Sequence, residues 1–176
     1  IAPQEKTVSD FLGGFVVTAG IGEEALSKEY EKENDDYHAL LVKALADRLA
    51  EAFAEHMHER VRKEYWGYCT EESFNNEELI SENYQGIRPA AGYPACPEHS
   101  EKETLFSLLE PEKSIGVSLT ESYAMRPAAS VSGLYFSHPE SRYFSVGKIS
   151  ESQVDDLALR KSVSKEKLAK LLSQNL

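Results

Sequence analysis

The chain has 176 residues, a formal net charge of −11 at pH 7 and 41% apolar residues. This length is enough for one domain with a buried core. The acidic balance argues against nucleic acid as a partner, because phosphate contacts need a basic surface. The sequence also contains no apolar run that approaches the ~18 residues of a membrane helix, so we expect no membrane contact.

The start of the sequence and its cysteines give expectations about context. Residues 1–6 lack the charged and apolar regions of a secretory signal, and without an initial methionine we expect a cut boundary. Cys69 and Cys96 are too few for a disulfide framework and lack zinc-ribbon spacing. We therefore expect reduced thiols and a cytoplasmic location.

The first predicted elements are a buried strand and a long helix. Residues 11–19 (FLGGFVVTA) are apolar and β-branched, which predicts a buried strand. A glycine turn follows, and Glu23 and Glu24 open a short helix with acids at its positive end. Residues 35–65 place apolar side chains at a 3.6 period, which predicts a long spine helix that begins at a capping aspartate or asparagine and ends near Gly67.

Shorter elements follow along the chain. The expected order is a capped helix at 75–80, a loop rich in glycine and proline at 86–97, a helix at 97–109 that starts with a capping-box-like SEKE, a strand at 115–119, a hairpin of strands 134–137 and 143–146 around the turn 138–141, and helices at 152–160 and 164–172. Helices and strands do not alternate strictly, which favours an α+β fold with a small antiparallel sheet. No GxGxxG pattern follows a strand, so a Rossmann-type site is not expected.

The loop at 88–97 (RPAAGYPACP) is the first candidate site. Arg88 offers a planar fork for a carboxylate, and Gly92 lets the backbone approach a ligand closely. The prolines lower the entropy cost of ordering the loop, and Tyr93 can offer a hydroxyl or a ring face to a cation. A structural turn with a surface arginine is the alternative.

Two other segments have open interpretations. Residues 118–133 are rich in small and hydroxylated side chains, which suit either a ligand pocket or an ordinary connection. The aromatic residues of the predicted hairpin favour cross-strand packing, with a ligand-stacking wall as the alternative. Glu51 lies on the long helix, where a solvated carboxylate is usual. Glu82 lies just before the loop and could reach a ligand cation.

Metal and nucleophile sites have less support in the sequence. His56 and His58 point about 200° apart on a helix, so they cannot share one metal. Cys96 and His99 form a CxxH pair without a matching second pair, which leaves a thiol-dependent enzyme as a weak alternative. Basic residues at 60–63 and 160–170 predict solvated helix faces, with a docking surface as the alternative.

Three segments carry a family resemblance. Residues 86–106 (GIRPAAGYPACPEHSEKETLF), 118–149 (SLTESYAMRPAASVSGLYFSHPESRYFSVGKI) and the helix at 35–68 resemble the C-terminal AdoMet-binding reactivation domain of cobalamin-dependent methionine synthase. The resemblance covers nearly the whole chain in one order. It implies a C-shaped α+β body with a long spine helix, several shorter helices and a small antiparallel sheet. It also implies that residues 1–176 are the C-terminal portion of a single domain whose N-terminal half is absent.

The resemblance implies a methyltransferase function. S-adenosylmethionine (AdoMet) would be bound for the reductive remethylation of cob(II)alamin, with the cobalamin held by a neighbouring domain of the same enzyme and the electron supplied by a flavodoxin-like reductase. No catalytic nucleophile is expected in this chain, because the cobalt acts as one, and we expect the fragment alone to be inactive. The alternative is a non-catalytic module that docks the cobalamin domain and the flavodoxin-type donor without using AdoMet.

The resemblance also implies AdoMet-binding residues in the loop. Arg88 would engage the methionine carboxylate, and main-chain groups near Ala90 and Gly92 would bond the polar edges of the ligand. Tyr93 would lie close to the sulfonium and its methyl group.

Outside the loop, the resemblance places Glu51 and Glu82 near the ligand and the cobalamin, and Tyr143 and Phe144 against the adenosyl part. Two departures from the family accompany these assignments. The aspartate that contacts the ligand ammonium belongs to the absent half, so we expect an incomplete site. Arg126 stands where relatives carry an aromatic residue.

Overall fold

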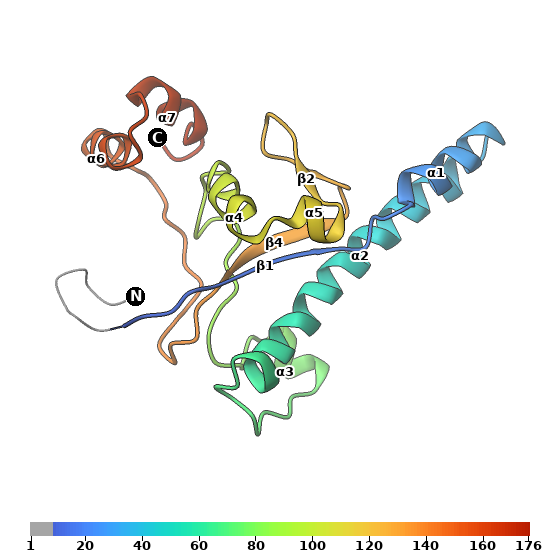
Figure 1. The fold of residues 1–176 in the computed structure, drawn as a ribbon, viewed down its shortest axis with the longest axis horizontal. Coiled ribbons are helices and arrows are strands. Elements are labelled where there is room, and N and C mark those ends of the chain that lie inside the picture. The colour runs from blue at the N-terminus through green and yellow to red at the C-terminus, as the bar shows by residue number, and fades with distance from the viewer. Residues whose placement is uncertain (1–8) are drawn as a thin grey trace.

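The computed structural model describes residues 9–176 (Figure 1), so the prediction about residues 1–6 lies outside the described part. The elements in chain order are β1 (Gly13–Thr18), α1 (Glu23–Lys32), α2 (Asp36–Arg60), the π-helical turn η1 (Val61–Tyr65), α3 (Asn76–Ile80), α4 (Glu101–Leu109), α5 (Pro111–Ile115), β2 (Ser118–Leu119), β3 (Met125–Arg126), β4 (Ser130–Tyr135), α6 (Glu151–Lys161) and α7 (Lys165–Leu171). The predicted α+β class is confirmed. Within the described residues, none of these helices is both long and apolar enough to cross a membrane.

The central sheet is the antiparallel pair of β1 and β4, which runs in register from Gly13 opposite Tyr135 to Thr18 opposite Ser130. The predicted first strand is thus confirmed for six residues. Phe15 and Val17 alternate with less buried neighbours, as expected for a strand with one face in the core. The Phe15 ring stacks on Tyr135 with 4.6 Å between centroids. A second, very short sheet pairs β2 with β3.

The long helix α2 lies diagonally across the central sheet (Figure 1). The Asp35 side chain caps its first turn by accepting a hydrogen bond from the His38 backbone N–H at 3.1 Å. The helix buries a face of small side chains, among them Ala50 and Ala54, against the sheet. Its α-helical part gives way to η1 at Val61, and Gly67, with φ of 69°, ends the helical run as predicted.

The predicted hairpin after β4 is wrong. Residues 141–150 form neither helix nor strand. One edge of β4 pairs with β1, and the other edge is already bonded by the loop before α4. Ile87 and Phe136 exchange two backbone bonds of 2.9 and 3.0 Å, and Leu134 N–H donates to the Pro89 carbonyl at 3.0 Å. Both edges of β4 are therefore in use, and a strand at 143–146 has no place beside it.

Two smaller predictions also need correction. The strand expected at 115–119 is reduced to Ser118 and Leu119, because α5 takes in Ile115 and Gly116 ends it with φ of 71°. Ser100 does not cap α4, since its hydroxyl donates to Glu98 instead.

The C-terminal helices α6 and α7 form a pair with their own small core (Figure 1). Ser150 and Ser164 cap them as N-terminal side-chain acceptors, which confirms the serine cap predicted for the last helix. The core of the pair contains Val154, Ala158 and Leu168. Lys161 at the end of α6 forms ion pairs with Glu98, just before α4, and with Glu101, the first residue of α4, which tie the helix pair to the rest of the chain.

Candidate functional site

The loop at 88–97 folds back on itself through three backbone hydrogen bonds. Gly92 N–H donates to the Cys96 carbonyl at 2.7 Å, Cys96 N–H donates to the Tyr93 carbonyl at 2.9 Å, and Tyr93 N–H donates to the Ala90 carbonyl at 3.3 Å. Gly92 has φ of 97°, a conformation that favours glycine. The backbone bonds of the described residues do not use the Ala90 N–H or the Gly92 carbonyl.

A second layer supports this loop from the start of α4. The imidazole of His99 fills the position that a Cβ at residue 92 would take. The nearly buried Lys102 ammonium donates to His99 Nδ1 at 3.1 Å and to the Tyr123 carbonyl at 3.0 Å. Burial lowers the pKa of both His99 and Lys102, so His99 accepts as a neutral ring. The glycine is therefore needed for close approach as well as for its φ angle.

Arg88 points inward from the loop toward α2, and its side chain is only 22% exposed. Its Nη1 donates to Tyr84 Oη at 2.8 Å and lies 3.3 Å from His58 Nδ1, while Nη2 forms an ion pair with Glu55. Burial opposes the charge, but the attraction of Tyr84 and Glu55 raises the pKa of Arg88 above its ordinary value. The guanidinium is thus fixed in place and charged.

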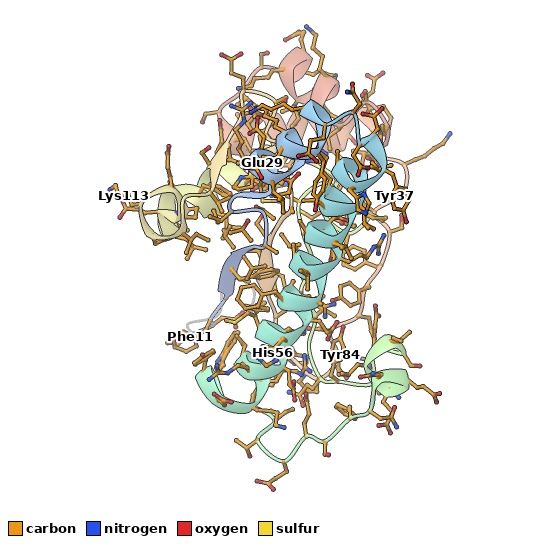
Figure 2. The ribbon with its side chains drawn as sticks, turned by 90° about the vertical axis from the view of Figure 1, so that its right-hand side faces the viewer. Phe11, Glu29, Tyr37, His56, Tyr84 and Lys113 are labelled. Carbon is orange, nitrogen blue, oxygen red and sulfur yellow. The ribbon has the colours of Figure 1, made fainter. Side chains whose placement is uncertain are left out.

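A buried polar network lies behind Arg88, where Tyr84 meets the C-terminal end of α2 (Figure 2). His58 is fully buried and stacks on Tyr135, with 5.2 Å between centroids. Burial, together with the charges of Arg62 and Arg88, lowers the pKa of His58 to about 2, so the ring is neutral. Arg62 has no exposed side-chain surface and forms an ion pair of 2.6 Å with Glu72. Its guanidinium also lies over the Tyr84 ring, 4.3 Å from the centroid.

Tyr93 projects outward from the same loop and is 58% exposed. Its pKa is raised, first by partial burial and then by the negative charges of Glu51 and Asp47 on α2. Two of the predicted site residues, Tyr93 and Glu51, are therefore close enough to interact electrostatically on an exposed surface.

Glu82 and Tyr143 border a polar pocket of about 410 Å³ that is lined by residues 82–87, Pro139 and residues 141–143. The Tyr143 hydroxyl accepts a hydrogen bond of 2.9 Å from the Arg88 backbone N–H. Glu82 is exposed and has φ of 56°. The structure thus joins Tyr143 to the loop through its hydroxyl and places Glu82 on the same pocket.

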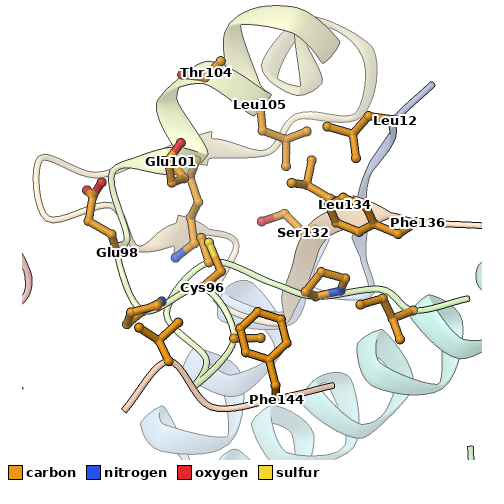
Figure 3. Close-up of a pocket in the computed structure, with 18 of the residues that line it drawn as sticks. Leu12, Cys96, Glu98, Glu101, Thr104, Leu105, Ser132, Leu134, Phe136 and Phe144 are labelled. Atoms are coloured by element: carbon orange, nitrogen blue, oxygen red, sulfur yellow. The ribbon is translucent and has the colours of Figure 1, made fainter. Parts of the chain in front are cut away.

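Phe144 lies on a different, mainly apolar pocket of about 1050 Å³ (Figure 3). Cys96, Leu105 and Phe136 also line this pocket, which separates the loop from the C-terminal helices. The neighbouring aromatic residues Tyr143 and Phe144 therefore face two different pockets. The predicted shared contact of this pair with one ligand does not follow from their placement.

Sequence reasoning missed several residues of the site. Glu55, Tyr84 and His58 hold Arg88, and Asp47 joins Glu51 beside Tyr93. One signal was available: positions 47, 51 and 55 are acidic at a spacing of four, which places three carboxylates in one row along a helix.

The alternative sites have little structural support. Burial, followed by the charges of Glu101 and Glu98, raises the pKa of the Cys96 thiol, which opposes formation of a thiolate nucleophile. In the described part of the chain, no group of three or more metal-binding side chains comes together.

Six basic side chains of the two basic segments form ion pairs with acids of the chain, which weakens the docking alternative. The partners are Arg60 with Glu64, Arg62 with Glu72, Lys63 with Glu59, Arg160 with Asp156, Lys161 with Glu98 and Glu101, and Lys165 with Asp155 and Glu151. The prediction of solvated faces is wrong for Arg62, which is fully buried.

The fold and the site together define a class of protein: an α+β domain in which a loop closed by its own backbone hydrogen bonds lies against an acidic helix face. Comparison with known proteins identifies the family. A family model described as "Vitamin B12 dependent methionine synthase, activation domain" matches residues 1–162. The chain belongs to this family.

A solved structure gives the same result. The "Crystal Structure of the MetH Reactivation Domain bound to AdoHcy" matches with a TM-score of 0.91 and 60% sequence identity. The match covers 94% of this chain and 51% of that chain. The sequence thus spans about half the length of the chain that it resembles.

Proposed function

We propose that this chain is the C-terminal half of an activation domain that holds AdoMet for the remethylation of cob(II)alamin. The related structure is described as bound to AdoHcy, which is what AdoMet becomes after it loses its methyl group. The observation that carries the proposal is the meeting of the 88–97 loop with the acidic row of α2. This meeting puts an anchored arginine, an exposed tyrosine and two carboxylates around one short loop.

Arg88 is the proposed partner of the ligand carboxylate. A guanidinium has five N–H donors, and the contacts to His58, Tyr84 and Glu55 use three of them. One donor on Nε and one on Nη2 remain for a carboxylate, and a fork of this kind suits two oxygens. Because the side chain is already held in place, binding costs little side-chain entropy.

Tyr93 is the proposed partner of the sulfonium. A tyrosine ring attracts a cation, and the negative charges of Glu51 and Asp47 favour positive charge near it. The Ala90 N–H and the Gly92 carbonyl are the loop groups proposed to bond the polar edges of the ligand.

The adenosyl part is proposed to contact Tyr143, with Glu82 on the same pocket. Tyr143 is already bonded to the backbone of Arg88, so it moves with the binding loop. Phe144 faces the apolar pocket instead, and its contact with the ligand would require residues 141–150 to turn.

Bound AdoMet supplies the methyl group, and its sulfur keeps the electron pair of the broken bond as AdoHcy leaves. This chain contributes position: Arg88 fixes one end of the ligand, and Tyr93 with Glu51 orients the sulfonium toward its acceptor. We further propose that the cobalamin lies on a neighbouring domain, that a flavodoxin-type protein supplies the electron, and that the enzyme is cytoplasmic. The last point is supported by the two free cysteines.

Calorimetric titration of AdoMet into a domain-length protein tests the proposal. We expect Arg88→Ala to weaken binding by about 10- to 100-fold, because it removes a charge-assisted fork. Arg88→Lys keeps the charge beside Glu55 but loses the fork, so the affinity of this variant should lie between those of the unaltered protein and the Arg88→Ala protein. Arg160→Ala removes an exposed arginine of α6 and serves as the matched control. Equal affinity of the Arg88→Ala and Arg160→Ala proteins would show that the arginine assignment is wrong.

A further inference from the structure

Along the long helix α2, three alanines are buried against the sheet while several large apolar side chains are exposed. Ala46, Ala50 and Ala54 face the central sheet and are at most 7% exposed. Five large apolar residues at a spacing of four, which we call the apolar stripe, are between 36% and 71% exposed: Tyr37, Leu41, Leu45, Leu49 and Phe53. Some of the apolar residues whose 3.6 period predicted the helix therefore face solvent and not the central sheet.

The stripe is one continuous surface. Residues four apart on a helix lie above one another, so the five side chains form a row of more than four turns. A helix turns by about 100° per residue, so the row winds slowly around α2, and each of its last three members lies about 100° around the helix from the buried alanine that follows it in sequence. The helix α1 packs along a different side, where the Ser27 hydroxyl bonds the carbonyl of the buried Ala39 at 3.3 Å. Single exposed leucines are ordinary on protein surfaces, but a contiguous row of this length marks an interface.

The central sheet also has an exposed edge, with exposed apolar side chains next to it. Among the described residues, β1 pairs with β4 alone, so the other edge of β1 offers unpaired backbone groups. Just before β1, the large side chains of Phe11 and Leu12 are 75% and 51% exposed. Exposed apolar edges of this kind are usually covered in complete domains.

We propose that the apolar stripe is the packing surface for the other half of the activation domain. The related domain continues for about as many residues again outside the matched region, because the match covers only 51% of it. A second body of that size, joined covalently, is available to cover the stripe. The proposal rests on the domain assignment made above and goes beyond it, and it does not depend on AdoMet binding.

Site-specific thiol labelling of a domain-length chain without AdoMet tests the proposal. Leu45→Cys places a thiol in the middle of the stripe. Leu159→Cys places one at a leucine of α6 that is 81% exposed and serves as the matched control. Each protein is treated with a maleimide, and the modified peptides are quantified by mass spectrometry, which separates the new thiol from Cys69 and Cys96.

We expect the introduced thiol of the Leu45→Cys protein to react more slowly than that of the Leu159→Cys protein, by on the order of tenfold or more, and the two rates to become equal in urea. Equal labelling rates in the folded proteins would overturn the proposal. Protection that is lost when the protein is diluted from dimer to monomer would also overturn it, because a second copy would then be the occupant. AdoMet titration of the same two proteins reports separately on the proposed function.

Discussion

The two ends of α2 differ in how completely their side chains are partnered. At the C-terminal end, His58, Arg62 and Glu55 belong to a network that also holds Tyr84 and Arg88. Along the rest of the helix, large apolar residues face outward while alanines cover the sheet. One helix therefore supplies both a network of paired polar side chains and an exposed apolar surface.

The difference shows what each kind of interaction requires. All members of the network lie within this chain, since they come from α2, from the turn η1 and from residues 72–88. The apolar surface is left exposed by the described residues, and its proposed partner is the other half of the domain. A buried polar or charged group that finds no partner within the chain costs free energy. A single leucine that is exposed to solvent costs little. The predictions below test this contrast. They compare how much variants of the network and variants of the stripe change the free energy of unfolding.

The largest effect is expected at Arg62. Arg62→Ala leaves the carboxylate of Glu72 buried without its partner, and such changes cost about 3–5 kcal/mol. Arg60→Ala is the matched control, because Arg60 pairs with Glu64 on the exposed side of the same helical run, where solvent screens the pair and it contributes little to stability. Urea denaturation measures both free energies of unfolding. Similar losses in the two variants would contradict the burial of the network.

The pH dependence of stability is expected to follow His58. Its pKa is about 2 in the folded chain and 6.5 as its ordinary value, so below pH 6.5 the unfolded chain takes up a proton that the folded chain does not. The free energy of unfolding is therefore not reduced by His58 above pH 6.5. It falls as the pH is lowered below 6.5, and this residue accounts for up to about 1.4 kcal/mol per pH unit.

The matched control for this pH dependence is His56, an exposed histidine two residues earlier. Urea denaturation between about pH 7 and pH 5, the range in which an ordinary histidine titrates, should give a shallower slope for His58→Asn than for the unaltered chain. His56→Asn should keep the original slope. A His58→Asn protein with an unchanged slope would show that the ring is not held neutral in the fold.

The local pattern of the sequence was enough to predict most of the elements. The strand at β1, the helices α1, α2 and α3, the two C-terminal helices and the glycine-dependent loop all follow from periodicity, capping residues and breakers near in sequence. The failed hairpin shows the limit. Residues 143–146 have strand-like side chains, but Ile87 and Pro89, more than fifty residues away, occupy the edge of β4.

The site was predictable in part for the same reason. Arg88, Gly92 and Tyr93 lie in one loop whose composition marks it, and their proximity needs no tertiary information. The partners of Arg88 come from α2 and from Tyr84, and only the fold brings them there. Tyr143 and Phe144 are adjacent in sequence, yet they face two different pockets, as successive residues of an extended segment do. The C-shape and the ligand contacts concern the whole domain and stay predictions.

The smallest effect is expected on the stripe, and it depends on the length of the chain. In the 176-residue chain, Leu49→Ala removes a side chain that is 61% exposed and should change the free energy of unfolding by no more than about 0.5 kcal/mol. Its neighbour Ala50 has no exposed surface, so Ala50→Leu overfills the contact with the sheet and should cost about 1–3 kcal/mol.

In a domain-length chain with the stripe covered, the cost of Leu49→Ala should rise to about 2–5 kcal/mol, the range for a buried leucine. Urea denaturation of both lengths measures the change. A Leu49→Ala cost that stays small in the longer chain would mean that the stripe remains exposed there, because only burial makes the loss of a leucine costly.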